Sequence, residues 1–384
     1  MLFRKRELLR EFLQSEQAGG IILVACTAMS LTISNTQFGE LWAGLWNFMI
    51  AGHSITHWIN DGLMAIFFLL IGLELEREIY TGELADIKKA ALPIAGALGG
   101  MVVPAGIFLA FNFGLATQRG AGIPMATDIA FALAALSLAG RNIPISLKIF
   151  LTALAVIDDL GAIIIIAVFY TKTLSGLYLG LALLTFAVLI GLNRKKVNRL
   201  EPYIIGGIAM WYFMLNSGVH ATISGVLLAF AIPFRNGNET SPSYKVQHFL
   251  HKPVAFIILP LFAIANTAIQ LSGSLPDIFN EPMSAGIVSG LVIGKPAGIL
   301  FFTFMAVKLK LCTLPDNLGW DHIFGTGILA GIGFTMSIFI TLLAFDEVPI
   351  VENAKISIMI ASFVAGVTGI IVLRIINNKK NIAG

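Results

Sequence analysis

The sequence predicts an all-α polytopic membrane protein with twelve transmembrane helices, and three observations support this prediction. Hydrophobic residues make up 57% of the 384-residue chain, and the mean hydropathy is +0.86. Charged residues make up only 12%, against roughly 25% in soluble domains. Apolar runs of about 20 residues, long enough to cross a bilayer, recur along the chain. A soluble enzyme, a nucleic-acid binder and a disordered chain are therefore excluded.

The chain begins with a basic, amphipathic segment, residues 1–16, which we expect to lie in the cytoplasm. The apolar run after it has no small-residue cleavage site, so it stays as the first span. We expect residues 17–384 to form a single transmembrane domain. The predicted spans lie at about 17–34, 58–76, 91–112, 122–140, 149–170, 175–192, 202–216, 218–234, 253–272, 284–307, 324–345 and 354–376.

The positions of Lys and Arg predict the orientation of these spans. With the N-terminus inside, nearly all basic residues between the spans fall in inner segments. This distribution follows the positive-inside rule, and an odd number of spans would break it. Both termini are therefore predicted to be cytoplasmic.

The first outer segment predicts a short β-hairpin over about residues 41–57. Trp42 and Trp46 would lie on one strand face, and Ala51 and Gly52 would form the turn. The aromatic face suggests a partner surface or an interfacial belt. The alternative is a loop that lies on the lipid headgroups.

A short internal repeat links the third and tenth spans. VVPAGIFL at 102–109 is similar to GKPAGILF at 294–301, and the two spans run in opposite directions. Such inverted-topology repeats are typical of secondary transporters, whose sites lie at the repeat interface near the membrane midplane.

Asp158 and Asp159 lie at the centre of the fifth span. One charged residue there costs about 2.5–3.5 kcal/mol on insertion scales. Adjacent carboxylates in a low dielectric resist ionising together, and a small hard cation relieves their repulsion. The pair therefore predicts a site where protons and a cation compete. The alternative is a structural pair that neighbouring helices satisfy.

Lys295 lies halfway along the tenth span, where it must pair or lose its proton. Its expected partner is Asp158 or Asp159, and the sequence does not decide between the two. An ion pair there could break when a cation or a proton arrives. The alternative is a purely structural pair.

Two spans contain residues that favour a broken helix. In the fourth, Thr127 and Asp128 follow a proline; in the eleventh, Gly331, Gly333 and Thr335 fall in one short stretch. A broken helix exposes carbonyls and helix ends near the membrane centre. Asp128 would compensate the positive helix ends or bind the cation directly. The glycines could instead serve close helix packing.

Titratable residues also lie near the span ends. Glu74, Arg77 and Glu78 share one helix face, as positions i, i+3 and i+4 do, although a solvated helix end has the same pattern. Histidine titrates near neutral pH, and three histidines lie at span ends: His220, His248 and His251. Neither the histidines nor the two distant cysteines have the spacing of a metal site.

Seven motifs occur in order along nearly the whole chain: GLELERE, ATDIAFALA, LAVIDDLGA, SGVHATISGV, LPLFAIANTA, GKPAGI and GIGFTMSIFI. Together they resemble the NhaA-type bacterial Na+/H+ antiporters. The resemblance implies twelve helices with inverted-topology repeats and two interrupted helices, the fourth and eleventh spans, that cross at the midplane. It implies a core within 91–170 and 284–376, and an interface panel within 17–76 and 175–272.

The resemblance also implies a function. The protein would be a pH-regulated, electrogenic antiporter of the bacterial inner membrane, not an enzyme, that expels Na+ and Li+ in exchange for protons. It would need no cofactor or resident metal and would form a homodimer through the outer hairpin. The implied roles are cation and proton binding for Asp158 and Asp159; site support for Thr127, Asp128, Lys295, Gly331, Gly333 and Thr335; and pH response for Glu74, Arg77, Glu78, His220, His248 and His251.

Two positions depart from the family pattern. A basic residue is expected where this chain has Glu76, and an acidic residue where it has Gln247. Two other functions remain as alternatives. A Na+-coupled organic-anion carrier would need more basic groups in the membrane, and an intramembrane aspartyl protease would need its aspartates on different helices.

Overall fold

The computed structural model describes residues 2–140, 143–170, 174–270, 280–315 and 317–383. Most of these residues are helical, and one small antiparallel sheet is present among them. The chain divides into two compact units. Unit 1 contains Met1–Ala28, Asp86–Ala162 and Ile269–Gly384, and unit 2 contains Met29–Ala85 and Ile163–Ala268. Residues 1, 141–142, 171–173, 271–279, 316 and 384 of the predicted segments lie outside the described residues.

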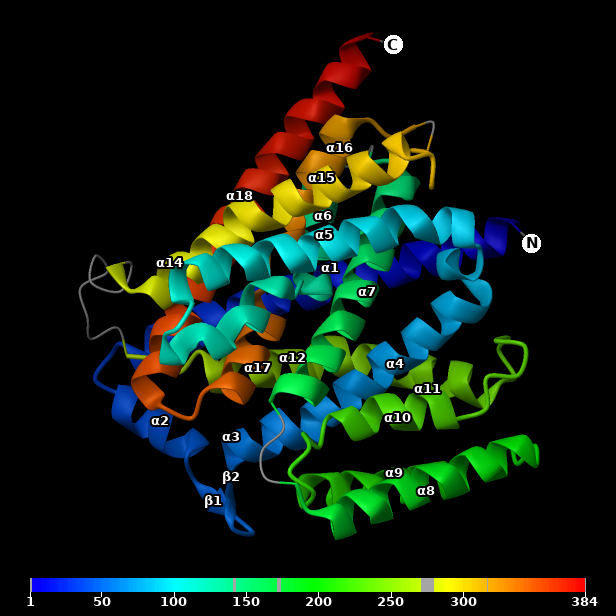
Figure 1. Cartoon of the computed structure of the whole chain (residues 1–384), viewed down its shortest axis with the longest axis vertical. Helices are drawn as coiled ribbons and strands as arrows, with labels where there is room; N and C mark the ends of the chain where they lie inside the picture. The colour runs from blue at the N-terminus through cyan, green and yellow to red at the C-terminus, as the bar shows by residue number, and fades with distance from the viewer. Residues whose placement is uncertain (1, 141–142, 171–173, 271–279, 316, 384) are drawn as a thin grey trace. The chain divides into compact units, whose positions relative to one another are not determined.

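Unit 1 repeats one order of elements: a long helix, a bent pair and a long helix (Figure 1). The first set is α5 (Ile87–Asn112), the 3-10 helix η3 (Ala116–Met125) with α6 (Ile129–Leu138), and α7 (Ile145–Phe169). The second set is α14 (Pro282–Ser289) continuing through η5 (Gly290–Gly294) into α15 (Lys295–Lys308), then α16 (Trp320–Ala330) with α17 (Phe334–Ala344), and α18 (Val348–Ala383).

The bent pairs confirm the predicted interruptions of the fourth and eleventh spans. The chain bends by 45° between η3 and α6 and by 47° between α16 and α17. At the first break Asp128 has extended backbone and caps α6, as its side-chain oxygen favours. At the second, Gly331 follows the last residue of α16 as its C-cap, and Gly333 is the N-cap of α17.

Glycines bring the helices α5 and α15 of unit 1 into backbone contact. A Cβ atom at Gly99 would collide with the carbonyl oxygen of Gly298, and a Cβ atom at Gly298 would collide with that of Gly99. Such close approach is the usual role of small residues between membrane helices, where packing replaces the hydrophobic effect.

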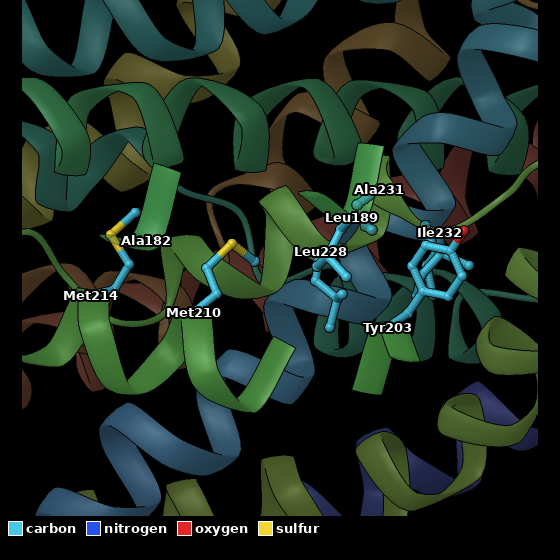
Figure 2. Packing of buried hydrophobic residues seen from close by; sticks show 10 residues of the cluster. Ala182, Leu189, Tyr203, Met210, Met214, Leu228, Ala231 and Ile232 are labelled. Atoms are coloured by element: carbon cyan, nitrogen blue, oxygen red, sulfur yellow. The ribbon is translucent and has the colours of Figure 1, made fainter. Parts of the chain in front are cut away.

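Unit 2 consists of helices and the small sheet. Its elements are α2 (Gly39–Trp46), β1 (Met49–Ile50), β2 (His53–Ser54), α3 (Ile55–His57), η1 (Trp58–Leu63), α4 (Met64–Thr81), η2 (Glu83–Ala85), α8 (Gly176–Arg194), α9 (Glu201–Leu215), α10 (Ile223–Ala231), α11 (Pro242–Pro253), η4 (Val254–Ile258) and α12 (Leu259–Asn266). Figure 2 shows its hydrophobic cluster, in which side chains from α8, α9 and α10 meet, among them Leu189, Met210 and Leu228.

Within the described residues, seven helices are long and apolar enough to cross a membrane. The number rises to nine if each bent pair is counted as one span. Of the other three predicted spans, the first corresponds to a shorter apolar helix, Ala18–Ser34 within α1 (Leu2–Ser34), and the seventh and eighth fall on α9 and α10. The chain is thus a multi-pass membrane protein, and its total of twelve spans stays a prediction.

Among the residues that the structure describes, three π-helical turns interrupt spans that the sequence predicts as continuous α-helix. Two of them, η4 and η5, end just before Pro260 and Pro296. A proline has no N–H for the carbonyl one turn earlier, which loosens the preceding turn into a π-bulge. The third is η1, which has no proline.

The predicted hairpin is confirmed only in part. Its strands pair Met49 with Ser54 and Ile50 with His53, and the turn uses positive φ angles at the two residues between them. The predicted placement of Trp42 and Trp46 on a strand of this hairpin is wrong, because residues 39–46 form α2. Trp42 and Trp46 lie one helical turn apart, with their rings in edge contact at 5.4 Å.

Candidate functional site

The candidate ion site is built around the middle of α7 in unit 1. Asp158 and Asp159 are 1% and 0% exposed, so the helix buries two adjacent carboxyl groups in its apolar surroundings. A buried carboxylate needs a counter-charge or hydrogen-bond donors to offset lost hydration. The partners of the two side chains therefore determine what the site can bind.

Lys295, the first residue of α15, provides the counter-charge. Its Nζ lies 2.9 Å from Asp158 Oδ2, and both side chains are fully buried. The ammonium group also donates to the carbonyl oxygen of Met125, the last residue of η3. Asp158 is thus the aspartate that pairs with Lys295, a choice that the sequence left open, while Asp159 lies within its electrostatic reach.

Thr127 joins the aspartate to the two helix breaks. Its Oγ1 lies 2.8 Å from Asp158 Oδ2 and 3.0 Å from the carbonyl oxygen of Ala330, which ends α16. One hydroxyl proton serves one acceptor at a time. The contact with Asp158 can therefore be exchanged for the one with Ala330.

Asp128 connects the amino ends of α6 and α17. Its Oδ1 accepts from the Phe131 N–H at 3.0 Å, and its Oδ2 accepts from the N–H and the hydroxyl of Thr335 at 3.0 and 2.5 Å. Its own N–H donates to the Ile332 carbonyl at 2.7 Å. Helix amino ends carry partial positive charge, so one carboxylate compensates both ends.

Gly331 and Gly333 allow the second break to pack tightly. A Cβ atom at Gly331 would collide with the carbonyl oxygen of Leu291 in η5, and one at Gly333 would collide with the Ser337 hydroxyl. Neither glycine has a positive φ angle. Close approach, rather than an unusual backbone angle, therefore requires glycine here.

This arrangement concentrates oxygen atoms at one place in unit 1. Asp158 Oδ1 is buried and accepts no hydrogen bond from the described residues. The Thr127 hydroxyl contacts the same carboxyl group, and the Met125 carbonyl oxygen contacts its lysine. The Ala330 carbonyl oxygen lies 3.0 Å from that hydroxyl. Carboxylate, hydroxyl and carbonyl oxygens bind protons or hard cations.

Part of the predicted pH-response group meets at one tyrosine of α11. The Arg77 guanidinium on α4 lies 5.6 Å from the centre of the Tyr244 ring. The same ring stacks on His248 at 6.0 Å, one helical turn later. Tyr244 thus joins the two predicted residues, and its i, i+4 spacing to His248 was the signal available in the sequence.

The remaining predicted residues of this group have other surroundings. Glu78 Oε2 accepts from the Glu83 N–H at 3.0 Å and caps the end of α4, and Glu74 lies on the same helix, partly buried. His251 follows His248 on α11. His220 is elsewhere in unit 2: its Nε2 lies 3.0 Å from the carbonyl oxygen of Tyr170.

Several functional contacts were not predicted from the sequence. Ser362 on α18 accepts from the Phe334 N–H at 3.1 Å, and Ser337 donates to the Ile123 carbonyl at 2.7 Å. These bonds hold the start of α17 and carry no signal in a single sequence. In unit 2, His57 Nδ1 lies 3.2 Å from Asp61 Oδ2, which the i, i+4 spacing could have indicated.

Comparison with known proteins gives one consistent result. The family model described as Na+/H+ antiporter 1 matches residues 10–373. The chain is 62% identical over 379 residues to the Na(+)/H(+) antiporter NhaA of Flavobacterium psychrophilum, covering 97% of this chain and 99% of that protein.

Two further relatives carry the same name. The NhaA antiporter of Cytophaga hutchinsonii is 55% identical over 368 residues, covering 96% of this chain and 95% of the relative. That of Dechloromonas aromatica is 54% identical over 374 residues, covering 96% of both. With a family match over nearly its full length and relatives this similar, the chain belongs to the NhaA-type Na+/H+ antiporter family, whose members are transporters rather than enzymes.

Proposed function

We propose that this protein expels cytoplasmic Na+, and Li+ in its place, in exchange for external protons, and so serves sodium and pH homeostasis. The observation that carries the proposal is the buried pair on α7, Asp158 and Asp159, with Lys295 on one of its carboxyl groups. Both ions compete for the same oxygens, because a protonated carboxyl group holds a cation poorly.

The exchange proceeds by alternating access to this one site. Na+ from the cytoplasm binds the carboxylates and displaces protons, and Lys295 leaves Asp158 as the cation takes its place. Unit 1 then opens the site to the outside, where protons displace Na+. Thr127 follows this change by turning its hydroxyl from Asp158 to the Ala330 carbonyl, 3.0 Å away.

The same groups support electrogenic exchange. The two carboxyl groups and the Lys295 ammonium can together release more than one proton when a single Na+ binds. Each cycle would then move net positive charge inward, so the membrane potential, worth about 2.3 kcal/mol per charge per 100 mV, would drive Na+ expulsion.

The architecture we propose has twelve spans in the bacterial inner membrane with both termini in the cytoplasm. The two sets of long helix, bent pair and long helix in unit 1 support inverted-topology repeats. In this arrangement the breaks joined by Asp128 and Thr335 cross at the midplane, and the segments within 91–170 and 284–376 form the core. The segments within 17–76 and 175–272 form the interface panel, and 1–16 stays cytoplasmic.

The pH regulation that we propose acts at the ends of α4 and α11. Glu74, Arg77 and Glu78 would respond together with His248 and His251, and the contacts of Tyr244 with Arg77 and His248 support this coupling. His220 would tune the response separately, through its contact with Tyr170.

A homodimer through the outer hairpin is also part of the proposal. The side chains of Phe48, Met49 and Ile50 are 63%, 60% and 50% exposed, which is unusual for large apolar residues outside a lipid or protein contact. Pairing of β1 or β2 with a second copy would bury them.

Neither alternative function fits the family to which the chain belongs. A protease is an enzyme, whereas the relatives are named as antiporters. Both aspartates also lie on one helix, α7. An organic-anion carrier would need its deep cation available to substrate, whereas Lys295 is paired with Asp158.

Transport in proteoliposomes tests the proposed function. With an acidic interior and no organic solute, adding Na+ or Li+ outside should collapse the pH gradient, and a valinomycin-clamped potential should change the rate. A pH gradient that Na+ leaves intact, or collapse that requires an organic anion, would overturn it.

A further inference from the structure

Unit 2 contains a cavity that the proposed ion exchange does not use. Its volume is about 490 Å³, within the range of roughly 300–1,000 Å³ that is typical of small-molecule sites. It lies where α4, α8 and α10 end, at Thr81, Arg194 and Ala231, so all three helices approach it with their carboxyl ends. Helix carboxyl ends carry partial negative charge and favour a positively charged group.

Glu76 places a buried carboxyl group in the wall of the cavity. This residue lines the cavity and is only 4% exposed. Its Oε2 accepts no hydrogen bond from any residue within the described part of the chain. Buried polar groups nearly always have a hydrogen-bond partner. The carboxyl group is therefore placed to accept a hydrogen bond from a cationic donor that enters the cavity.

Aromatic rings indicate what kind of cation this is. Tyr80, Phe230 and Phe234 line the same cavity, and the rings of Tyr80 and Phe234 lie 5.1 Å apart. Ammonium groups bind the faces of aromatic rings. A metal ion such as Ca²⁺ would instead need six or more oxygen ligands. One carboxylate among aromatic rings favours an organic ammonium group.

Arg235 adds a positive charge at the wall of the cavity. Its Nε and Nη2 donate to Asn198 Oδ1 at 3.0 and 2.9 Å, which fixes the guanidinium group. Its φ angle is +54°, an unusual value for a residue other than glycine, and such strain often accompanies ligand sites. Guanidinium groups bind phosphate oxygens well.

We propose that this cavity binds a zwitterion that carries an ammonium and a phosphate group. The ammonium group lies against Glu76 and the aromatic rings, and the phosphate group lies against Arg235. Two sources have this chemistry: the headgroup of an aminophospholipid such as phosphatidylethanolamine, and a free phosphorylated amine. Bound there, the ligand joins α4, which carries Glu76, to the segment after α10, which carries Arg235.

Isothermal titration of the purified full-length protein tests this proposal with three soluble probes. Phosphoethanolamine should bind at least about tenfold more tightly than ethanolamine or ethyl phosphate, since each of these carries one of the two charges. Glu76→Gln should weaken phosphoethanolamine binding about tenfold and leave ethyl phosphate unaffected. Arg235→Gln should weaken both phosphate-bearing probes. Glu201→Gln, the same change at an exposed residue of α9, should alter neither.

A second arm separates the two sources. Short-chain phosphatidylethanolamine that binds more tightly than phosphoethanolamine, with phosphatidylglycerol failing to compete, assigns the site to a lipid headgroup. Equal or weaker binding of the lipid assigns it to a free phosphorylated amine. Asp159→Asn, which is expected to stop transport, should bind phosphoethanolamine like the unmodified protein, so failure of this site and failure of the exchange mechanism are distinguishable.

The proposal is overturned if neither phosphoethanolamine nor the lipid binds. It is also overturned if Glu76→Gln retains full affinity while its circular dichroism and melting temperature match those of the unmodified protein. Should Glu76→Gln fail to fold, Arg235→Gln and the comparison of the three probes on the unmodified protein decide the question.

Discussion

Two neighbouring side chains on α7, Asp158 and Asp159, are the centre of the proposed exchange. Asp158 contacts Lys295 and Thr127. Asp159 is fully buried on the same turn and lies within electrostatic reach of that lysine. The two neighbours therefore have different surroundings. Asp158 has a buried counter-ion, and we propose that Na+ displaces it when the cation binds the pair.

Asp159→Asn is expected to stop exchange without unfolding the protein. The amide keeps the volume but has neither a charge for Na+ nor a proton to exchange. Na+-driven proton flux in proteoliposomes should fall by at least about a hundredfold, which corresponds to about 2.7 kcal/mol of lost stabilisation. Asp346→Asn, the same change at an exposed residue, is the control and should leave the flux unaltered. Normal flux in Asp159→Asn would refute the proposed role.

Lys295→Met should lower the melting temperature, because it leaves the Asp158 carboxylate buried without its cation. Removing one partner of a buried pair costs about 3–5 kcal/mol. Asp158→Asn should destabilise the protein in the same way, by isolating Lys295. The double variant should melt above both single variants, since no buried charge of the pair remains. Strictly additive losses in this cycle would show that the two residues do not interact.

The helices of unit 1 place this chemistry through their two breaks. Asp128 accepts hydrogen bonds at the starts of α6 and α17, so one residue connects the second helix of each bent pair. Its backbone N–H bonds Ile332 in the other break. The breaks therefore act as one structural element, although they are about 200 residues apart in the sequence.

Asp128→Ala should destabilise unit 1 more than a single lost helix cap would. One cap is worth about 1 kcal/mol, and compensation of two helix ends adds to this, so a loss of about 2–3 kcal/mol is expected. Thr335→Val removes one of the hydrogen bonds and should cost less. Thermal unfolding in detergent measures both variants. A melting temperature of Asp128→Ala equal to that of Thr335→Val would contradict the double-capping role.

Gly331→Ala should impair exchange, because its Cβ atom would push the second break away from the Leu291 carbonyl. Gly106→Ala is the matched control: it lies on α5, and no atom lies within 4 Å of the added Cβ. The control should be neutral or slightly stabilising, by up to about 1 kcal/mol. Transport assays and melting curves should therefore separate the two variants. Equal behaviour would mean that the close approach at Gly331 is unimportant.

The sequence indicates the features of unit 1 that violate membrane energetics. A charged residue at the centre of a span is costly in the membrane, so Asp158 and Asp128 stand out. Glycines and a proline within a span disfavour a continuous helix, so the two breaks also stand out. The choice of Asp158 over Asp159 as the partner of Lys295 depends on how α15 is rotated against α7, which no local pattern encodes. The sequence also cannot indicate that the Met125 and Ala330 carbonyl groups lie at the site, since every residue has a carbonyl group.

Sequence patterns were least informative at short elements of unit 2. The aromatic residues at 42 and 46 fit both a period of two and a helical turn, and in α2 their rings lie one turn apart in edge contact. The Trp42 indole N–H also bonds the Ser30 hydroxyl at 3.1 Å, a tertiary contact that overrides strand preference. Such short elements have too few residues for periodicity to decide.

The proposed exchange depends on a competition between two ions within unit 1. In this proposal protons and an alkali cation need the same carboxyl oxygens, so binding of one must release the other. Family membership identifies both substrates as Na+ and protons, and the buried Asp158–Lys295 pair supplies a physical reason for their exchange. The zwitterion site in unit 2 is independent of this competition.

Calorimetry on the purified protein measures the competition directly. NaCl is titrated at fixed pH in two buffers with different ionisation enthalpies, and the difference in heat gives the protons released for each Na+ bound. We predict release of protons within the active pH range and none in Asp159→Asn. Sodium binding with identical heats in both buffers at every pH would contradict the competition of the two ions for one site.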